Sequence, residues 1–183
     1  MDSPNEGLVY EGMLPLSLTT IEQFPSDSEY VTFNSVNENL LKANLILHDS
    51  PELDDHDDIS LELRRQDMKI SLLLELVGEL LRQHQLVPEA QKLKLTSSSI
   101  ECSMPDALKH NLVKGSKVSI NLYISSSTPK PLKLFGELIE LSTDQKIVGI
   151  NFKGLTQTVQ DWMEKTIFQH HRRTVAQSLS KKT

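Results

Sequence analysis

Residues that could carry catalytic chemistry are few in this sequence, and they are scattered. The six histidines show no spacing to a nucleophile, and the adjacent His170 and His171 point to different faces of a helix. The single cysteine, Cys102, lies in an alternating strand pattern without a basic neighbour, so we expect a buried structural residue. The acidic run DDHDD at 54–58 suits the positive end of a helix better than a metal site. Since no phosphate-binding glycine loop or dinucleotide fingerprint is present either, we predict neither an enzyme nor a resident cofactor or metal.

Composition narrows the remaining classes of protein. The formal net charge is −6, which disfavours a DNA- or RNA-binding surface because such surfaces are basic. One cysteine excludes an intrachain disulfide and suits the cytoplasm. The first residues, MDSPNEGLVYEG, lack the basic and apolar parts of a signal peptide, and no apolar run is long enough to cross a membrane. We expect a soluble cytoplasmic protein that forms one domain over residues 1–183.

The segment 57–84 is rich in leucine and is the most distinctive feature of the chain. Its length predicts a helix of about 40 Å, which is longer than a small domain covers with its own residues. Its apolar residues follow a heptad repeat, which is typical of a coiled-coil seam. The predicted oligomer core consists of Ile59, Leu63, Gln66, Ile70, Leu73, Val77 and Leu80. Gln66, together with His84 further along the seam, either fixes the register and the number of strands or forms a water-exposed layer.

The apolar stripe of this helix is wider than a two-stranded seam needs. Leu74 and Leu81 border the seam, and Leu72 and Leu76 lie further round the helix. Wide stripes favour assemblies of more strands, or an outer layer of helices. We therefore predict a parallel homotetramer, with a second helix at 35–48 covering the flank of the long helix. The alternative is a helix buried in the core of a monomer, for which the chain offers few other helices.

The N-terminal part of the chain predicts one strand before these two helices. Residues 8–19 read as a strand, with Pro15 at an edge or a bend. Residues 25–34 are polar and are predicted as a connector, after which Asn34 or Ser35 caps the next helix.

From residue 92 onward the apolar period changes from that of a helix to that of strands. The alternating segments predict short antiparallel strands with one buried face, which is typical of a small barrel or sandwich. The apolar face switches across Gly136, which suggests a β-bulge there. A last helix begins near Thr156 or Thr158 and ends with basic residues. The patterns together predict an α+β fold.

Residues 92–173 resemble a PilZ domain. The resemblance is carried by the strand that enters LTSSSIEC, the strands KVSINLYI and PLKLFGELIEL, and the segment VGINFKGL that runs into the helix DWMEKTIFQHHRR. The segments ISLLLELVGELLRQ and IFQHHRRTVA are similar to the atypical, tetrameric branch of that family. The resemblance implies a small antiparallel PilZ-type β-barrel, whose main part and C-terminal helix occupy 92–173. Two inserted helices, at 35–48 and 57–84, precede this part, and the second of them is a coiled-coil oligomerisation element.

PilZ domains are receptors for cyclic di-GMP, so the resemblance implies a bacterial signalling protein with this dinucleotide as its candidate ligand. Ordinary members use an Arg-x-x-x-Arg motif and an Asp/Asn-x-Ser-x-x-Gly motif. Arginine suits the ligand because it binds phosphate in a fork and stacks on guanine. Both motifs are absent here, and LTSSSI places Lys94, Thr96 and Ser99 at the second motif, where only Thr96 keeps the chemistry. The candidate ligand-binding residues are Thr96, Ser99, Arg172 and Arg173.

Three functions remain open on the sequence alone. In the first, the module binds cyclic di-GMP weakly or by a non-standard surface that uses Arg172 and Arg173. In the second, it is a degenerate PilZ adaptor that binds a protein partner and not the nucleotide, and in the third it is a structural scaffold. The two arginines otherwise only complement the negative end of their helix. In each case we expect the chain to assemble with itself.

Overall fold

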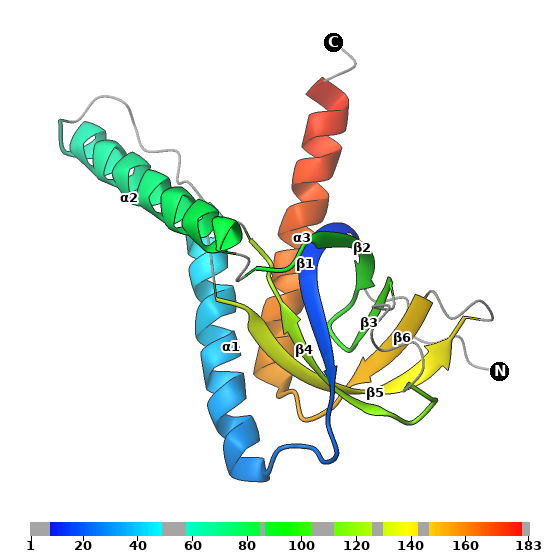
Figure 1. Cartoon of the computed structure of the whole chain (residues 1–183). Coiled ribbons are helices and arrows are strands. Elements are labelled where there is room, and N and C mark those ends of the chain that lie inside the picture. Colours follow the sequence, from blue (N-terminus) through cyan, green and yellow to red (C-terminus); the bar gives the residue numbers. More distant parts are fainter. Residues whose placement is uncertain are drawn as a thin grey trace.

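The computed structural model describes residues 8–48, 58–84, 87–103, 112–125, 130–142 and 147–180 of the chain. This described part forms six strands and three helices (Figure 1). In chain order they are β1 (Tyr10–Thr20), α1 (Asp27–His48), α2 (Asp58–Gln83), β2 (Ala90–Leu95), β3 (Ser99–Ser103), β4 (Lys117–Leu122), β5 (Leu132–Leu141), β6 (Ile147–Phe152) and α3 (Gln157–Ser180). The predicted α+β fold is confirmed, because the strands build an antiparallel barrel with two helices inserted after β1 and a helix at the C-terminal end.

The six strands close into a barrel in the order β1-β2-β3-β6-β5-β4, and every pair is antiparallel. The long strand β1 closes it, because residues 10–15 pair with β2 and residues 16–20 pair with β4. Pro15 stands where β1 changes partner, and its carbonyl accepts a hydrogen bond from the main-chain N–H of Tyr123 at 3.0 Å. A proline is tolerated at such a change of partner because it has no N–H to give to a ladder. The predicted bend fits this position, and closure leaves no free edge.

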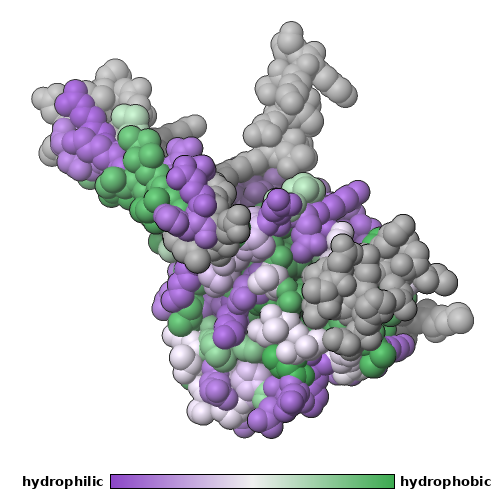
Figure 2. All heavy atoms as spheres, viewed as in Figure 1, coloured by the Kyte–Doolittle hydropathy of each residue, from purple (hydrophilic) through white to green (hydrophobic). Residues whose placement is uncertain are grey.

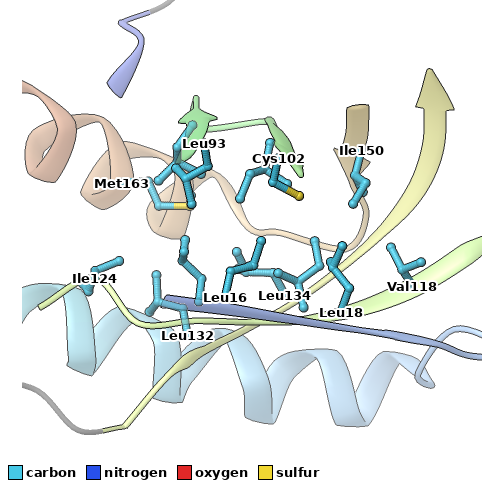
Figure 3. Close-up of a cluster of buried hydrophobic side chains, with 14 of the residues drawn as sticks. Leu16, Leu18, Leu93, Cys102, Val118, Ile124, Leu132, Leu134, Ile150 and Met163 are labelled. Atoms are coloured by element: carbon cyan, nitrogen blue, oxygen red, sulfur yellow. The ribbon is translucent and has the colours of Figure 1, made fainter. Parts of the chain in front are cut away.

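The core fills the inside of the barrel with alternating aliphatic side chains (Figure 3). On β4, for example, Val118, Ile120 and Leu122 are fully buried while the residues between them are partly exposed. Helix α3 crosses one end of the barrel and buries Val159, Met163 and Ile167, and Figure 3 shows Met163 beside Leu93 of β2. Thr156 precedes this helix, and its hydroxyl accepts a hydrogen bond from the N–H of Val159 at 3.4 Å, which confirms the predicted start.

The bulge predicted at Gly136 lies elsewhere. The pairing of β5 with β6 is regular at Gly136 and shifts between Leu138 and Glu140, which leaves Ile139 as the extra residue. The need for a glycine at position 136 has a different reason. A Cβ at this position would lie 2.6 Å from the main-chain oxygen of Asn151. A glycine therefore allows β5 and β6 to approach closely there.

Helix α1 begins at Asp27, so the prediction of a polar connector over 25–34 and of a cap at Asn34 or Ser35 was wrong. Ser26 starts the helix instead. Its main-chain N–H and its hydroxyl donate to the carboxylate of Glu29 at 2.8 and 2.7 Å. The bond from the N–H of Ser26 is one arm of a capping box, in which a Glu of the first turn accepts from the residue that starts the helix.

Helix α1 packs on the barrel through polar as well as aromatic contacts. The amide of Asn37 donates to the carbonyl of Lys133 at 2.9 Å and accepts from its N–H at 3.0 Å. The residues of β5 before Gly136 do not pair with β6. At Lys133, the bonds to Asn37 take the place of that pairing. Nearby, the rings of Tyr30 and Phe33 pack against Phe135, with centroids 5.7 and 5.1 Å apart.

Helix α2 spans Asp58–Gln83, close to the predicted 57–84, and Figure 1 shows it projecting from the barrel. Among the described residues it makes at most marginal contact with any other element. Within the single chain, α1 packs against α3 and β5, and its covering of the flank of α2 in an assembly stays a prediction. The alternative, in which α2 is buried in the core of a monomer, is wrong.

Candidate functional site

Helix α2 carries more exposed large apolar side chains than any other described element. Eight large apolar side chains of this helix are exposed, with fractions from 45% for Val77 to 65% for Met68. Figure 2 shows them as a hydrophobic band along the helix. They are Leu63, Met68, Ile70, Leu72, Leu73, Leu76, Val77 and Leu80. Apolar surface of this extent indicates an interaction site.

The predicted seam residues all lie on this helix. Leu63, Ile70, Leu73, Val77 and Leu80 are exposed, as is Gln66, while the side chain of Ile59 lies outside the described residues. Their heptad spacing places them on one face of the helix. Whether this face binds other copies remains a prediction.

The two halves of α2 differ in polarity. In the first half, Gln66 donates to Glu62 at 3.1 Å, and Arg65 lies 3.6 Å from the same carboxylate. These exposed pairs contribute little to stability, since water screens them. From Ile70 onward, apolar residues occupy the seam and both of its borders. The second half is therefore the stronger candidate for an interface.

The turn between β2 and β3, which contains two candidate ligand-binding residues, is closed by its own hydrogen bonds. The hydroxyl of Thr96 accepts from the N–H groups of Ser98 and Ser99 at 3.2 and 2.9 Å. It also lies 2.9 Å from the hydroxyl of Ser99, and the N–H of Thr96 donates to the carbonyl of Ser99. The structure thus brings Thr96 and Ser99 together, but it uses their polar groups inside the turn.

Acidic groups surround this turn and the strand before it. The hydroxyl of Ser97 donates to Glu164 of α3 at 2.8 Å, which ties the turn to the helix. Lys94, at the motif position of an acid or amide, lies 3.8 Å from Glu11 and 3.8 Å from Glu101. The link between Ser97 and Glu164 escaped the sequence analysis, because nothing in either local sequence indicates a contact between residues so far apart in the chain. A carboxylate at this point disfavours the approach of a phosphate.

The remaining candidate residues lie further along α3. Arg172 is exposed, and the side chain of Arg173 lies outside the described residues. Eight residues separate Arg172 from Glu164, which corresponds to about 12 Å along a helix. The adjoining His170 contacts the ring of Tyr10, with centroids 5.1 Å apart. Arg172 therefore stands about two turns from the residue that touches the β2–β3 turn.

Other chemistry is limited in the described part of the chain. Cys102 is buried in β3, as predicted, and burial together with the charge of Glu101 raises the pKa of its thiol to about 12. A thiol with this pKa is unreactive near neutral pH. The described ranges hold no cluster of three metal-binding side chains, and the acidic run at 54–58 lies outside the described residues apart from the backbone of Asp58. None of the described helices is long and apolar enough to cross a membrane.

The fold is a closed barrel crossed by a C-terminal helix, with two helices inserted after its first strand, the second of them long and exposed. The family model for the atypical PilZ domain, cyclic di-GMP receptor, matches residues 43–180, and the chain belongs to this family. A solved structure with the same fold is a tetrameric PilZ domain of a pathogenic protein from Xanthomonas campestris, described as self-assembled via an unusual helical bundle. The two chains are 24% identical, with a TM-score of 0.72 over 94% of this chain and 92% of that chain. No curated protein matches the chain. The predicted family is confirmed.

Proposed function

We propose that the chain is a self-assembling module of cyclic di-GMP signalling that forms a homotetramer through α2 in the bacterial cytoplasm. The apolar band of α2 is the observation that carries this proposal, because the single chain leaves it in water. Burying a leucine-sized side chain contributes about 1.5–3 kcal/mol. Association costs about 4–15 kcal/mol in lost freedom of motion. Five such side chains from each copy, each about half exposed in the single chain, make a contribution of the same size as this cost. They are Leu63, Ile70, Leu73, Val77 and Leu80.

Four parallel copies suit the second half of α2 better than two. A dimer covers the seam residues but leaves both borders of the seam exposed, whereas a four-stranded bundle covers a wider stripe. Leu76 on one border is exposed, and Leu74 on the other is only half-buried within the chain. The tetramer described for the Xanthomonas campestris protein gives further support, since that protein has the same fold.

We further propose that residues 1–183 form one domain. Residues 92–173 hold most of the barrel, but β1 pairs with both β2 and β4, so the barrel does not close without it. The helices α1 (Asp27–His48) and α2 (Asp58–Gln83), predicted at 35–48 and 57–84, are then insertions, and the second is the oligomerisation element.

For the ligand, we propose that cyclic di-GMP binds weakly or by a non-standard surface. The two arginines of the usual motif are missing, and each charge-assisted hydrogen bond that is lost removes about 1.5–3 kcal/mol. Tenfold in affinity corresponds to about 1.4 kcal/mol. The closed turn at Thr96 and Ser99, with Glu164 beside it, offers few free donors. Arg172, which is exposed, together with Arg173 next to it in the sequence, is the better candidate for the phosphates.

Titration calorimetry with cyclic di-GMP tests this proposal. We expect heat only at dinucleotide concentrations well above micromolar, and we expect it to disappear when Arg172→Ala and Arg173→Ala are combined. Submicromolar binding by the unmodified protein contradicts the proposal, since it requires a site that the missing motifs do not provide.

An adaptor that binds a protein and not the nucleotide is the second candidate function. The hydrogen bonds within the β2–β3 turn favour it, because they occupy the groups that would otherwise meet a ligand. Complete absence of heat with cyclic di-GMP, from a protein that is folded and assembled, supports this candidate. A purely structural scaffold would give the same absence and would also lack a protein partner.

A further inference from the structure

The single tryptophan of the chain, Trp162, lies where α1 and α3 pack together, and two lysines stand over its ring. Trp162 packs against the core and is partly exposed. The ammonium of Lys165, about one turn further along α3, lies 4.1 Å from the ring centroid, and that of Lys42 on α1 lies 5.4 Å from it. An aromatic ring and two cations thus meet on the surface of a chain whose formal net charge is −6.

The two lysines keep donors that the protein itself does not use. Glu38 forms an ion pair with Lys42 at 2.6 Å, which takes one of the three N–H donors of that ammonium. Asp161, which adjoins the tryptophan in sequence, accepts a hydrogen bond from Gln157 at 2.8 Å. Lys165 is exposed, and no carboxylate in the described part of the chain lies within ion-pair distance of its ammonium. An anion that reaches the ring therefore meets two available cations.

A partly exposed tryptophan beside ammonium groups suits a nucleotide. Bases stack on aromatic rings, and an ammonium binds phosphate as a point charge. The side chain of Lys165 is long and flexible, so a phosphate can draw its ammonium away from the ring, and a base can then take its place over Trp162. Lys42 reaches the same ring from the neighbouring helix. Cyclic di-GMP, the ligand named for this family, supplies both the base and the phosphate that such a cluster binds.

We propose that Trp162, Lys42 and Lys165 form a nucleotide-binding site, in which a guanine of cyclic di-GMP stacks on the ring and a phosphate pairs with the two lysines. This site is separate from the β2–β3 turn. At about 100° per residue, Glu164, which contacts that turn, lies on nearly the opposite side of α3 from Trp162. Position 173 follows Trp162 by eleven residues, about three turns, and lies on the same side. The inference rests on the proposed non-standard binding of cyclic di-GMP, and it names the residues that hold the base.

The fluorescence of Trp162 tests this site directly, because the chain has no other tryptophan. A guanine stacked on the ring quenches its emission. Titration of the full chain with cyclic di-GMP should therefore lower the fluorescence over the same concentrations that give heat in calorimetry. Lys165→Glu changes an exposed side chain and should weaken both signals by at least about tenfold. Lys114→Glu, an equal change of charge in the turn before β4, is the matched control and should leave both signals unchanged.

The outcomes separate this inference from the proposed function. Heat without quenching, or equal weakening by Lys165→Glu and Lys114→Glu, overturns this site and leaves weak binding of cyclic di-GMP elsewhere. Neither heat nor quenching, from a protein that is folded and assembled, overturns both.

Two further comparisons address the base and the phosphate separately. Guanosine, which has the base and no phosphate, should quench at least several-fold more weakly than cyclic di-GMP, and equal quenching overturns the role of the lysines. In calorimetry, Trp162→Phe keeps an aromatic ring and should bind several-fold more tightly than Trp162→Leu. Equal affinity of these two variants overturns the stacking of a base at this position.

Discussion

The barrel buries its inward apolar residues, whereas helix α2 leaves its apolar residues exposed. On β4 and β5 the inward side chains of Ile120, Leu122 and Leu134 are fully buried by other strands of the same chain. On α2, Leu73 and Leu80 remain more than half exposed, although they are as apolar as the core residues. The inward residues of the barrel are buried within one chain, whereas the apolar residues of α2 are left exposed to water. The stability of the barrel should therefore be independent of protein concentration, whereas the order of α2 should depend on it.

Breaking the seam should have the largest effect in the molecule. Leu73→Asp or Val77→Asp places four like charges in one layer of the bundle, where they cannot all be solvated. We expect dissociation to monomers whose barrel stays folded, measured as a fall in mass by sedimentation with an unchanged β-sheet signal in circular dichroism. Ser71→Asp, on the same helix but away from the seam, is the matched control and should stay assembled. A tetramer in Leu73→Asp would show that another surface holds the copies together.

A cavity in the barrel should act on the other region. Leu134 is fully buried, and Leu134→Ala removes contacts that the surrounding strands cannot replace, at a cost of about 2–5 kcal/mol. Urea unfolding followed by the fluorescence of Trp162, the single tryptophan, measures this loss. The mass of the assembled protein should remain that of a tetramer. Loss of assembly without loss of barrel stability would contradict the division between the two regions.

The docking of α1 should respond more weakly. Asn37→Ala leaves the N–H and carbonyl of Lys133 without their partner, and each unsatisfied group costs about 1–3 kcal/mol if water does not reach it. Asn39→Ala, on the exposed side of the same helix, is the control and should change little. The comparison of the two urea midpoints gives the effect. Equal midpoints would show that the aromatic contacts of Tyr30 and Phe33 hold α1 without help from Asn37.

The smallest expected effect concerns the capping box of α1. The hydrogen bonds from the hydroxyl and the main-chain N–H of Ser26 hold the pKa of Glu29 below its ordinary value of 4.5. A carboxyl whose pKa is lowered by folding stabilises the protein above the unfolded pKa, and this stabilisation is lost as the pH falls through the folded pKa. Glu29→Gln should therefore slightly lower the urea midpoint at neutral pH and match the unmodified protein in acid. A difference between the two proteins that grows toward low pH would have the wrong sign.

Patterns of local period predicted most of this fold, and long-range contacts explain what they missed. The heptad of α2 and the alternation of β4 each depend on a few neighbouring residues, so both were predicted from the sequence. The start of α1 could also have been predicted, since Ser26 and Glu29 have the spacing of a capping box. The polar run around them suggested a connector instead. The close approach of β6 to Gly136 depends on the register of two strands, so it was not predicted from the sequence.

The candidate ligand site shows the same limit more strongly. The resemblance of LTSSSI to the PilZ motif predicted that Thr96 and Ser99 lie together, and the structure places both in the β2–β3 turn. The bond from Ser97 to Glu164 joins residues 67 positions apart, and only the closed barrel with α3 across its end brings them together. The sequence therefore predicted which residues replace the usual motif, and it did not predict that an acidic helix residue stands over them.

The mass of the unmodified protein in solution shows how many copies assemble through α2. Light scattering coupled to size-exclusion chromatography, over a range of loading concentrations, measures it without reference to shape. We expect about four times the 20.7 kDa of the chain, because four copies cover the apolar band of α2. A mass of one chain at every concentration would contradict it, since the exposed side chains of α2 would then need no partner copy.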